Sequence, residues 1–422
     1  MNYRRLRSWF QKQLSLKKRI EYICICYILF LMTPKRKHSL DEAARMFSLH
    51  RSQFSRFLMN HSGVAIHNLN SLSKKQAKQF ARISKSLNNG TLPWKVAILI
   101  DSTLQRRSSL HPANAKRFNH GKGFVIGHQW TNIVLVIKDV VIPLQPIAFY
   151  SKKYCKNNGL TYKTEGDLVV DYIDRLNLKE YIGVHNPHEI VVLADSGYDA
   201  KKIEQAIVRK NWKFIIALKK KRSVKSEREN SITSKTKGWR QVAEFFKSHR
   251  WAKWQTIRVP TNSAGKKRME FRIRQIVGYL RYVGKVQLIC SEFEKRPDGR
   301  QKYLACNDLK AKARQILIGY RIRWAIEIFH KQVKMFMGFE DVATKYFLSV
   351  VSHVHWVYCA YILLNNSPPG IPDQCVSLAE KQRKVEETIS TQETCRVIQV
   401  LTQFKGPQRY KEELKQRLLL AD

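Results

Sequence analysis

Four side chains that could take part in chemistry recur at helical spacing between residues 320 and 334: Tyr320, Arg323, Glu327 and Lys334. Separations of three, four and seven residues place them on one face of a helix. A carboxylate flanked by two cations and a phenol can hold a divalent metal ion beside a nucleic-acid phosphate. The alternative is an intrahelical ion pair between Glu327 and Arg323 or Lys331.

Two further carboxylates follow continuous apolar runs. Asp101 comes after Val96–Ile100, and Asp195 comes at the end of the run 189–194. Such runs are typical of buried strands, so both aspartates are expected at the C-terminal ends of strands. With Glu327 they could bind two Mg²⁺ ions, which would deprotonate a water and stabilise the leaving 3′ oxygen of a phosphodiester.

Each acid also has a structural interpretation. Asp101 could end a strand in Asp-Ser-Thr, and Asp195 could form a turn in Asp-Ser-Gly. Asp199 and Glu340 are rival carboxylates for the same role. A shared site is favoured because acids are scarce in this chain, with 33 Asp and Glu in 422 residues.

The charge balance indicates a polyanionic partner. The chain has 77 Lys and Arg against 33 Asp and Glu, a formal net charge of +44. Such an excess favours DNA or RNA, because binding releases condensed counterions. An anionic membrane surface is the alternative, but no sustained basic amphipathic helix supports it. We therefore expect double-stranded DNA as the partner and no membrane association.

Cysteine usage and the N-terminal apolar run predict a cytoplasmic protein. The eight cysteines are scattered without a paired C-x2-C spacing, which indicates reduced core residues rather than a zinc site. Tyr22–Met32 is an apolar run of eleven residues, shorter than the ~20 needed to span a bilayer. We expect a buried helix there.

The N-terminal region reads as helical and basic, with a possible helix-turn-helix at 39–58. Ser39 is a plausible N-cap with Glu42 at the capping-box position. The second helix would direct Arg51, Gln53 and Arg56 toward DNA. Its apolar side chains, Phe54, Phe57 and Leu58, would pack inward. A two-helix hairpin with solvated basic residues remains the alternative.

Beyond residue 90 the pattern predicts an α/β fold. Three strands, a helix, a strand, a helix and a strand follow in order, which is the order of an RNase H-like mixed sheet flanked by helices. Four alternating segments then predict a β-rich insertion before the last helices. The expected domains are 1–90 (DNA-binding), 91–221 (first part of the catalytic core), 222–310 (insertion), 311–367 (second part of the core) and 368–422 (helical tail).

The chain resembles the DDE-type transposases of bacterial insertion sequences, in the branch marked by a Tyr-x2-Arg-x3-Glu-x6-Lys helix. Tyr320, Arg323, Glu327 and Lys334 fit that pattern without a gap. The contexts Asp101-Ser-Thr and Ala194-Asp-Ser-Gly-Tyr198 are also similar to the family. The 132 residues between Asp195 and Glu327 leave room for the family's β-rich insertion.

The resemblance implies cut-and-paste transposition: binding of terminal inverted repeats, metal-dependent cleavage, and joining of the 3′ hydroxyl to target DNA. It implies Asp101, Asp195 and Glu327 as ligands of two Mg²⁺ ions, replaceable by Mn²⁺, and Tyr320, Arg323 and Lys334 as phosphate contacts. A tryptophan of the insertion would stack on a flipped base, with Trp254, Trp239 and Trp251 as candidates and core packing as the alternative.

The resemblance further implies a homodimer that holds two transposon ends and a bacterial protein associated with the nucleoid. Two other functions remain open. One is a structure-directed nuclease with the same metal core, which would cleave without joining. The other is a non-catalytic or domesticated DNA-binding protein, in which the carboxylates serve only structure.

Overall fold

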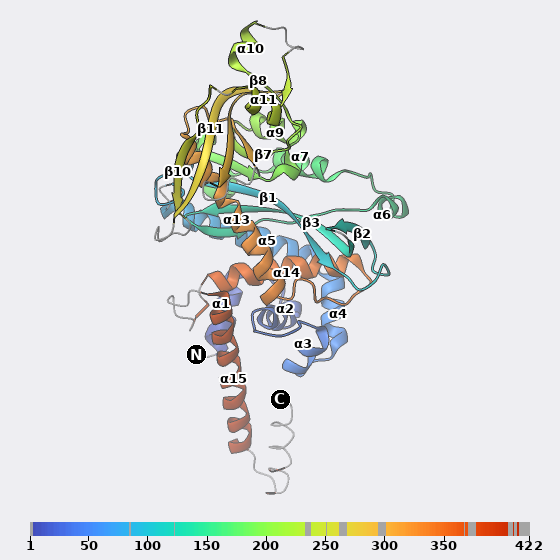
Figure 1. The fold of residues 1–422 in the computed structure, drawn as a ribbon. Coiled ribbons are helices and arrows are strands. Elements are labelled where there is room, and N and C mark those ends of the chain that lie inside the picture. The colour runs from blue at the N-terminus through green and yellow to red at the C-terminus, as the bar shows by residue number, and fades with distance from the viewer. Residues whose placement is uncertain are drawn as a thin grey trace. The chain divides into compact units, whose positions relative to one another are not determined.

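The computed structural model describes residues 3–83, 86–121, 123–232, 238–249, 251–260, 268–293, 301–366, 368–369, 377–403, 408 and 412. The chain forms two compact units. A helical unit comprises residues 1–73, 104–128 and 329–422, and a sheet unit comprises residues 74–103 and 129–328. Figure 1 shows the course of the chain through both.

The sheet unit contains a large mixed sheet flanked by helices. Its first half runs in the order β3, β1, β6, β7, with β4 and β5 beside β3. The three strands β1, β6 and β7 are parallel, and β4 and β5 are antiparallel to β3. This arrangement is consistent with an RNase H-like transposase domain. The strands are β1 (Val96–Arg106), β3 (Gly123–Ile137), β4 (Val140–Pro143), β5 (Ile147–Ala148), β6 (Ile190–Ala194) and β7 (Lys213–Leu218).

The strands of the 222–310 segment extend this same sheet. β13 pairs with β7, and the order continues through β12, β11, β8 and β9, with β10 beside β11. All of these pairings are antiparallel. The strands are β8 (Ser223–Ser226), β9 (Arg240–Gln241), β10 (Gln255–Pro260), β11 (Arg268–Leu280), β12 (Gly284–Phe293) and β13 (Lys302–Cys306), with the short helices α10 (Glu227–Ile232) and α11 (Val242–Ser248) between them.

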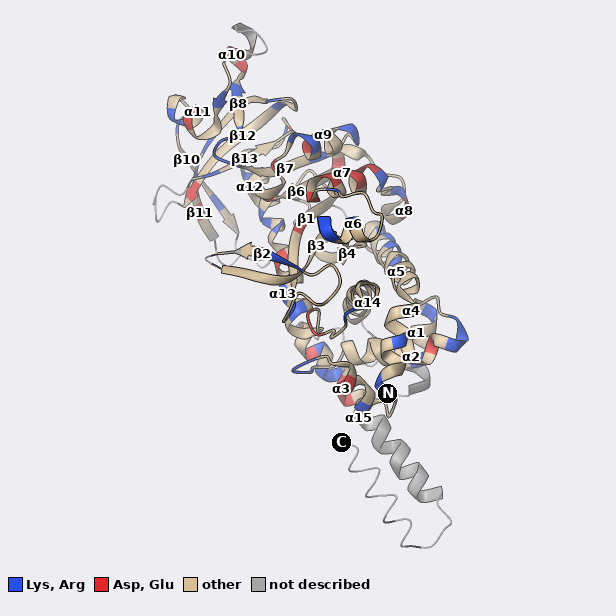
Figure 2. Cartoon of the chain, turned by 90° about the vertical axis from the view of Figure 1, so that its right-hand side faces the viewer, with Lys and Arg blue, Asp and Glu red and all other residues tan. Residues whose placement is uncertain are grey.

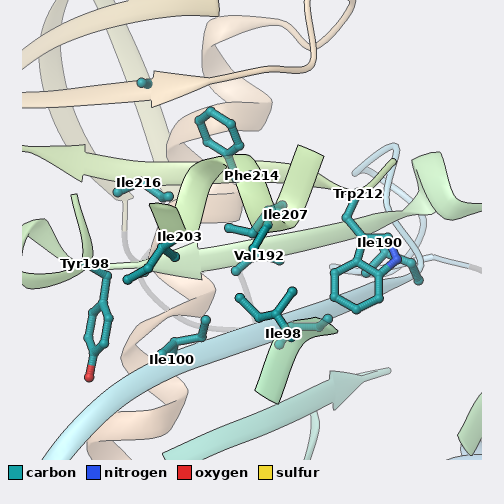
Figure 3. Close-up of a cluster of buried hydrophobic side chains, with 14 of the residues drawn as sticks. Ile98, Ile100, Ile190, Val192, Tyr198, Ile203, Ile207, Trp212, Phe214 and Ile216 are labelled. Carbon is teal, nitrogen blue, oxygen red and sulfur yellow. The ribbon is translucent and has the colours of Figure 1, made fainter. Parts of the chain in front are cut away.

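The core of the sheet unit lies where helices pack on its central strands (Figure 3). Every residue of β6 is buried, as expected for a central parallel strand covered on both faces. Ile203 and Ile207 of α9 (Lys201–Arg209) pack with Val192 and Phe214 of the sheet. α7 (Glu165–Arg175) adds Val169 and Ile173 to the same core. The remaining short helices of this region are α6 (Lys152–Asn157), α8 (Lys179–Ile182) and the 3-10 turns η1 (Pro187–Glu189) and η2 (Ser196–Tyr198).

Three local differences from the expected elements have physical causes. β1 does not end at Ile100 but continues to Arg106, because Arg107 N still donates to Ile126 O of β3. The strand-like sequence of residues 140–150 predicts a single strand, but the segment holds two short ones, since proline at 143 and 146 interrupts a hydrogen-bonded ladder. A strand at 116–120, β2, was not predicted.

The helical unit is built around α14 (Phe347–Asn365), of which nearly every residue is buried. α2 (Lys18–Leu31) and α4 (Arg51–Asn60) pack against it. Phe57 of α4 stacks on Trp356, with ring centroids 5.7 Å apart. The Tyr27 hydroxyl of α2 donates to His353 Nδ1 at 2.7 Å, because His353 Nε2 donates to Gly338 O. The other helices are α1 (Tyr3–Gln13), α3 (Leu40–Met46), α5 (Ser62–Ile83, which continues into the sheet unit) and α15 (Leu378–Gln403).

Two apolar helices of this unit are core helices by their burial. The run Tyr22–Met32 lies largely in α2, whose residues from Cys24 to Leu31 are all buried. Among the described helices, α14 is long and apolar enough to cross a bilayer, yet 89% of its most apolar stretch is buried inside the protein. Its side chains therefore already have protein partners.

The described cysteine side chains are free thiols in buried positions: Cys24, Cys26, Cys155, Cys290, Cys306 and Cys359. Cys375 and the side chain of Cys395 lie outside the described part. Of the predicted tail, α15 is described as a helix to Gln403, and most positions from 404 onward lie outside the described residues.

Candidate active site

Asp101 and Asp195 are neighbours across two parallel strands. The register of β1 and β6 ends with Ile100 opposite Ala194; Asp101 follows within β1, which continues to Arg106, and Asp195 directly follows the end of β6. Because adjacent strands lie ~4.8 Å apart, the two carboxylates come close together where β6 ends. The apolar residues that precede them are fully buried, and this anchors both backbones.

The backbone after Asp195 is held by its own side chain. Asp195 precedes η2, and its Oδ1 accepts a hydrogen bond from Gly197 N at 2.7 Å. A Cβ added at Gly197 would lie 2.9 Å from that oxygen. Glycine therefore permits the tight turn that presents the carboxylate, while the other oxygen, Oδ2, stays clear of this hydrogen bond.

Two consecutive helices supply the remaining residues. α12 (Ala313–Ile322) packs on the sheet through Gly319, where an added Cβ would come within 2.8 Å of Trp94 and 2.9 Å of Ile215. This close approach brings Tyr320, the next residue, to the sheet. Arg323 stands at the end of α12, and α13 (Trp324–Phe336) carries Glu327 in its first turn.

Arg323 bridges two of the three carboxylates. Its guanidinium bonds Glu327 Oε1 and lies 3.9 Å from Asp101 Oδ2. Burial raises the pKa of Asp101 to about 6, and the negative charges of Asp195 and Glu327 act in the same direction, against the opposing effect of Arg323. The three predicted acids are thus close enough for their charges to act on one another.

Lys302 is a further cation at this site that sequence reasoning did not identify. Its ammonium lies 5.5 Å from the centre of the Tyr320 ring. Burial and the neighbouring Arg323 lower the pKa of Lys302, whereas Glu327 and Asp195 act to raise it. No spacing in the sequence points to this residue, because it reaches the site only through the pairing of β13 with β7.

The rival carboxylates and Lys334 have other partners. Asp199 Oδ2 accepts from Lys219 N at 2.8 Å and lies beside Arg222. Glu340 accepts from Arg106 N at 3.3 Å, and Lys334, two helical turns beyond Glu327 on α13, lies 3.6 Å from Glu340. The structure gives Lys334 this ion pair within the helical unit rather than a contact with the three acids.

The predicted recognition residues lie on the exposed side of α4. Arg51, Gln53 and Arg56 are exposed, while Phe54, Phe57 and Leu58 are buried. Gln53 Oε1 accepts from His50 N at 3.1 Å as part of a capping box. Ser39 caps α3 by accepting from Glu42 N at 3.2 Å.

The tryptophan candidates differ in exposure. Trp254 is half-buried, with the guanidinium carbons of Arg272 and Arg274 at 4.8 and 5.4 Å from its ring centre. Trp239 is also half-buried. Trp251 is 69% exposed, which leaves most of its ring free of protein contact.

The donor atoms at this site suit a hard divalent cation. Asp101, Asp195 and Glu327 offer only carboxylate oxygens, the ligands that Mg²⁺ prefers. Burial, together with the negative charges of Asp195 and Glu327, raises the pKa of Asp101. In the described part of the chain, however, no three acidic, His or Cys side chains are close enough to hold a metal ion as a group. The guanidinium of Arg323 lies between Asp101 and Glu327.

Two neighbouring aspartates beside central parallel strands, with a glutamate on a nearby helix, form a group of carboxylates of the kind that metal-dependent nucleic-acid enzymes use. The sequence comparison is consistent with this: residues 166–363, a little under half of the chain, match the family model described as the transposase DDE domain. The match supports a DDE-type transposase. It includes Asp195 and Glu327 but begins after Asp101, which the sheet pairing adds to the set. No curated protein matches the chain.

Proposed function

We propose that this protein is the transposase of an insertion sequence, cutting DNA at terminal inverted repeats and joining the freed 3′ ends to target DNA. The observation that carries the proposal is the placement of Asp101 and Asp195 at adjacent positions of parallel strands, with Glu327 bridged to Asp101 through Arg323. The domain match supplies the activity class. Mg²⁺ or Mn²⁺ bound by the three carboxylates would activate the attacking oxygen and stabilise the leaving oxygen.

The other residues of the site would hold the DNA. Arg323 is placed to exchange its carboxylate contacts for a phosphate, since guanidinium groups bind both in the same bidentate geometry. The Lys302 ammonium and the Arg323 guanidinium carbon lie 5.5 and 5.8 Å from the centre of the Tyr320 ring, so these three side chains could contact one phosphate group together. Lys334 would contact phosphate two turns further along α13. These contacts would orient the scissile bond for in-line attack.

Sequence recognition would come from the exposed side of α4, with Arg51, Gln53 and Arg56 facing the terminal repeat. Trp254 would stack on an unpaired base of the cleaved end, with Trp251 as the more exposed alternative. The active assembly would be a homodimer on two DNA ends, and the protein would act in the bacterial cytoplasm on the nucleoid.

Excision from a plasmid tests the proposal. Purified protein, Mg²⁺ and a plasmid carrying this coding region with its native flanks should release a fragment with defined ends. Glu327→Gln and omission of metal should each abolish release. Glu244→Gln is the matched control, because Glu244 is exposed on α11 and the substitution changes charge equally.

The outcomes separate the candidate functions. Cleavage without joining would indicate a structure-directed nuclease. Sequence-specific binding by the wild type without any cleavage would overturn the catalytic proposal in favour of a DNA-binding protein.

A further inference from the structure

The unpredicted strand β2 (Lys116–His120) forms a two-stranded ribbon with the first part of β3 in the helical unit. The register pairs Lys116 with Gly127 and continues to His120 opposite Gly123. Gly121, with φ of 58°, provides the left-handed backbone conformation that a tight hairpin turn needs. At its base the ribbon adjoins β1, where an added Cβ at Gly127 would lie 2.1 Å from Gln105 O.

Both faces of the ribbon carry a cation against an aromatic ring. On one face the Arg117 guanidinium carbon lies 4.9 Å from the centre of the Phe124 ring. On the other face the Lys116 ammonium lies 4.9 Å from the centre of the Phe118 ring. Phe124 is 57% exposed, and Arg117 is also exposed. Neither face is therefore built like a strand that packs into a core.

The segment 104–128, which contains the ribbon, has basic residues but no acidic ones. Residues 104–128 contain five Lys and Arg and no Asp or Glu, and Figure 2 marks the basic residues on β2 in blue. Within the described residues, Arg117 has no acidic partner, whereas Arg45 on α3 of the same unit pairs with Glu42 at 3.0 Å. An unpaired cation held rigid over a ring suits an external anion.

We propose that this ribbon, residues 116–121 and 123–127, docks on double-stranded DNA, with Arg117 contacting a phosphate and the Phe124 ring packing against the sugar edge of a groove. The inference rests on the proposed function, because it takes DNA as the substrate. A two-stranded ribbon fits the major groove of B-DNA. The stacking on Phe124 restricts the Arg117 side chain before binding, which lowers the entropy lost when the phosphate contact forms.

Salt-dependent binding tests the ribbon directly. The affinity of the full-length protein for a 30-base-pair duplex is measured by fluorescence anisotropy between 50 and 200 mM salt, for wild type, Arg117→Ala and Phe124→Ala. Loss of one phosphate contact should reduce the slope of log affinity against log salt by about 0.9. Arg117→Ala should show this change, and Phe124→Ala should bind several-fold more weakly with the slope retained.

Lys384→Ala is the matched control, since Lys384 is a half-buried cation that already pairs with Glu387 at 2.8 Å on α15. It should leave the slope unchanged. If the wild type binds the duplex but Arg117→Ala keeps the wild-type slope and affinity, the ribbon inference is overturned while the proposed function stands. If the wild type does not bind DNA, both are overturned. Unchanged circular dichroism of the variants excludes misfolding as the cause.

Discussion

The sheet unit contains two clusters in which one arginine joins two carboxylates, and they differ in exposure. In the first, Arg323 joins Asp101 and Glu327, whose side chains are 20% and 31% exposed. In the second, Arg222 joins Asp199 and Glu204, whose side chains are 1% and 0% exposed. An arginine between two acids is therefore not in itself a functional site.

What distinguishes the first cluster is access and an excess of negative charge. Asp195 adds a third carboxylate beside Asp101, and DNA or a cation can reach the group from solvent. The second cluster is closed, and burial raises the pKa of Glu204 to about 8, with Asp199 acting in the same direction and Arg222 against it. The closed cluster around Arg222 therefore stabilises the fold, whereas the residues of the open cluster around Arg323 are free to bind a ligand from solvent.

The largest effect on stability should come from Arg222→Ala. This change leaves Asp199 and Glu204 buried without their cation, and breaking a buried pair in this way costs about 3–5 kcal/mol. Urea denaturation should show the loss as a lower midpoint with an unchanged slope. A loss below ~1 kcal/mol would mean that the second cluster is as open to water as the first.

Arg323→Ala should have the opposite effect, with a small change in stability and a large loss of DNA cleavage. Because the first cluster is partly exposed, stability should change by less than about 1 kcal/mol, while strand cleavage should fall by about 10²-fold through loss of a phosphate contact. Cleavage rates and urea midpoints are measured on the same preparation. Equal cleavage by Arg323→Ala and wild type would remove Arg323 from the active site.

The dependence of the free energy of unfolding on pH should reveal the titration of Glu204. Its folded-state pKa, about 8, lies above the ordinary 4.5, so its contribution is complete below pH 4.5 and is lost as pH rises through 8. Deprotonation should reduce the free energy of unfolding by up to ~1.4 kcal/mol per pH unit within that window. Glu204→Gln should flatten this part of the profile, and an unchanged profile would contradict a protonated Glu204.

The smallest effect should come from Lys302→Ala. Neighbouring groups desolvate the Lys302 ammonium, but the residue as a whole is exposed, so stability should stay within about 0.5 kcal/mol of wild type. Binding to a duplex that mimics the cleaved end should weaken, with the salt slope reduced by about 0.9. Lys310→Ala, at another exposed lysine of the same unit, supplies the comparison; an identical response from both variants would show that Lys302 has no special position.

The sequence contained enough to locate the central strands and the acids. Asp101 and Asp195 were indicated by the apolar runs before them, and the structure adds that these runs are parallel neighbours in register. Glu327 was indicated by its helical spacing from Arg323. These signals are local, since each depends on residues within one element.

Features that depend on strand pairing could not be read from the sequence. Lys302 reaches the site because β13 joins the edge of β7, a contact between residues about 90 positions apart. No pattern in the sequence of residues 222–310 indicated that their strands would extend the sheet formed by β3, β1, β6 and β7. β2 was missed because its residues, Lys-Arg-Phe-Asn-His, lack the alternation of a half-buried strand.

The most direct test of the central claim is a comparison of Asp195→Asn with Asp199→Asn. The two aspartates lie four residues apart, yet one belongs to the open cluster and the other to the closed one. Single-turnover cleavage of a terminal-repeat duplex, corrected for the folded fraction, should be abolished by Asp195→Asn and retained by Asp199→Asn, which should instead unfold at lower urea. Retained cleavage by Asp195→Asn, or its loss in fully folded Asp199→Asn, would contradict the assignment of the active site.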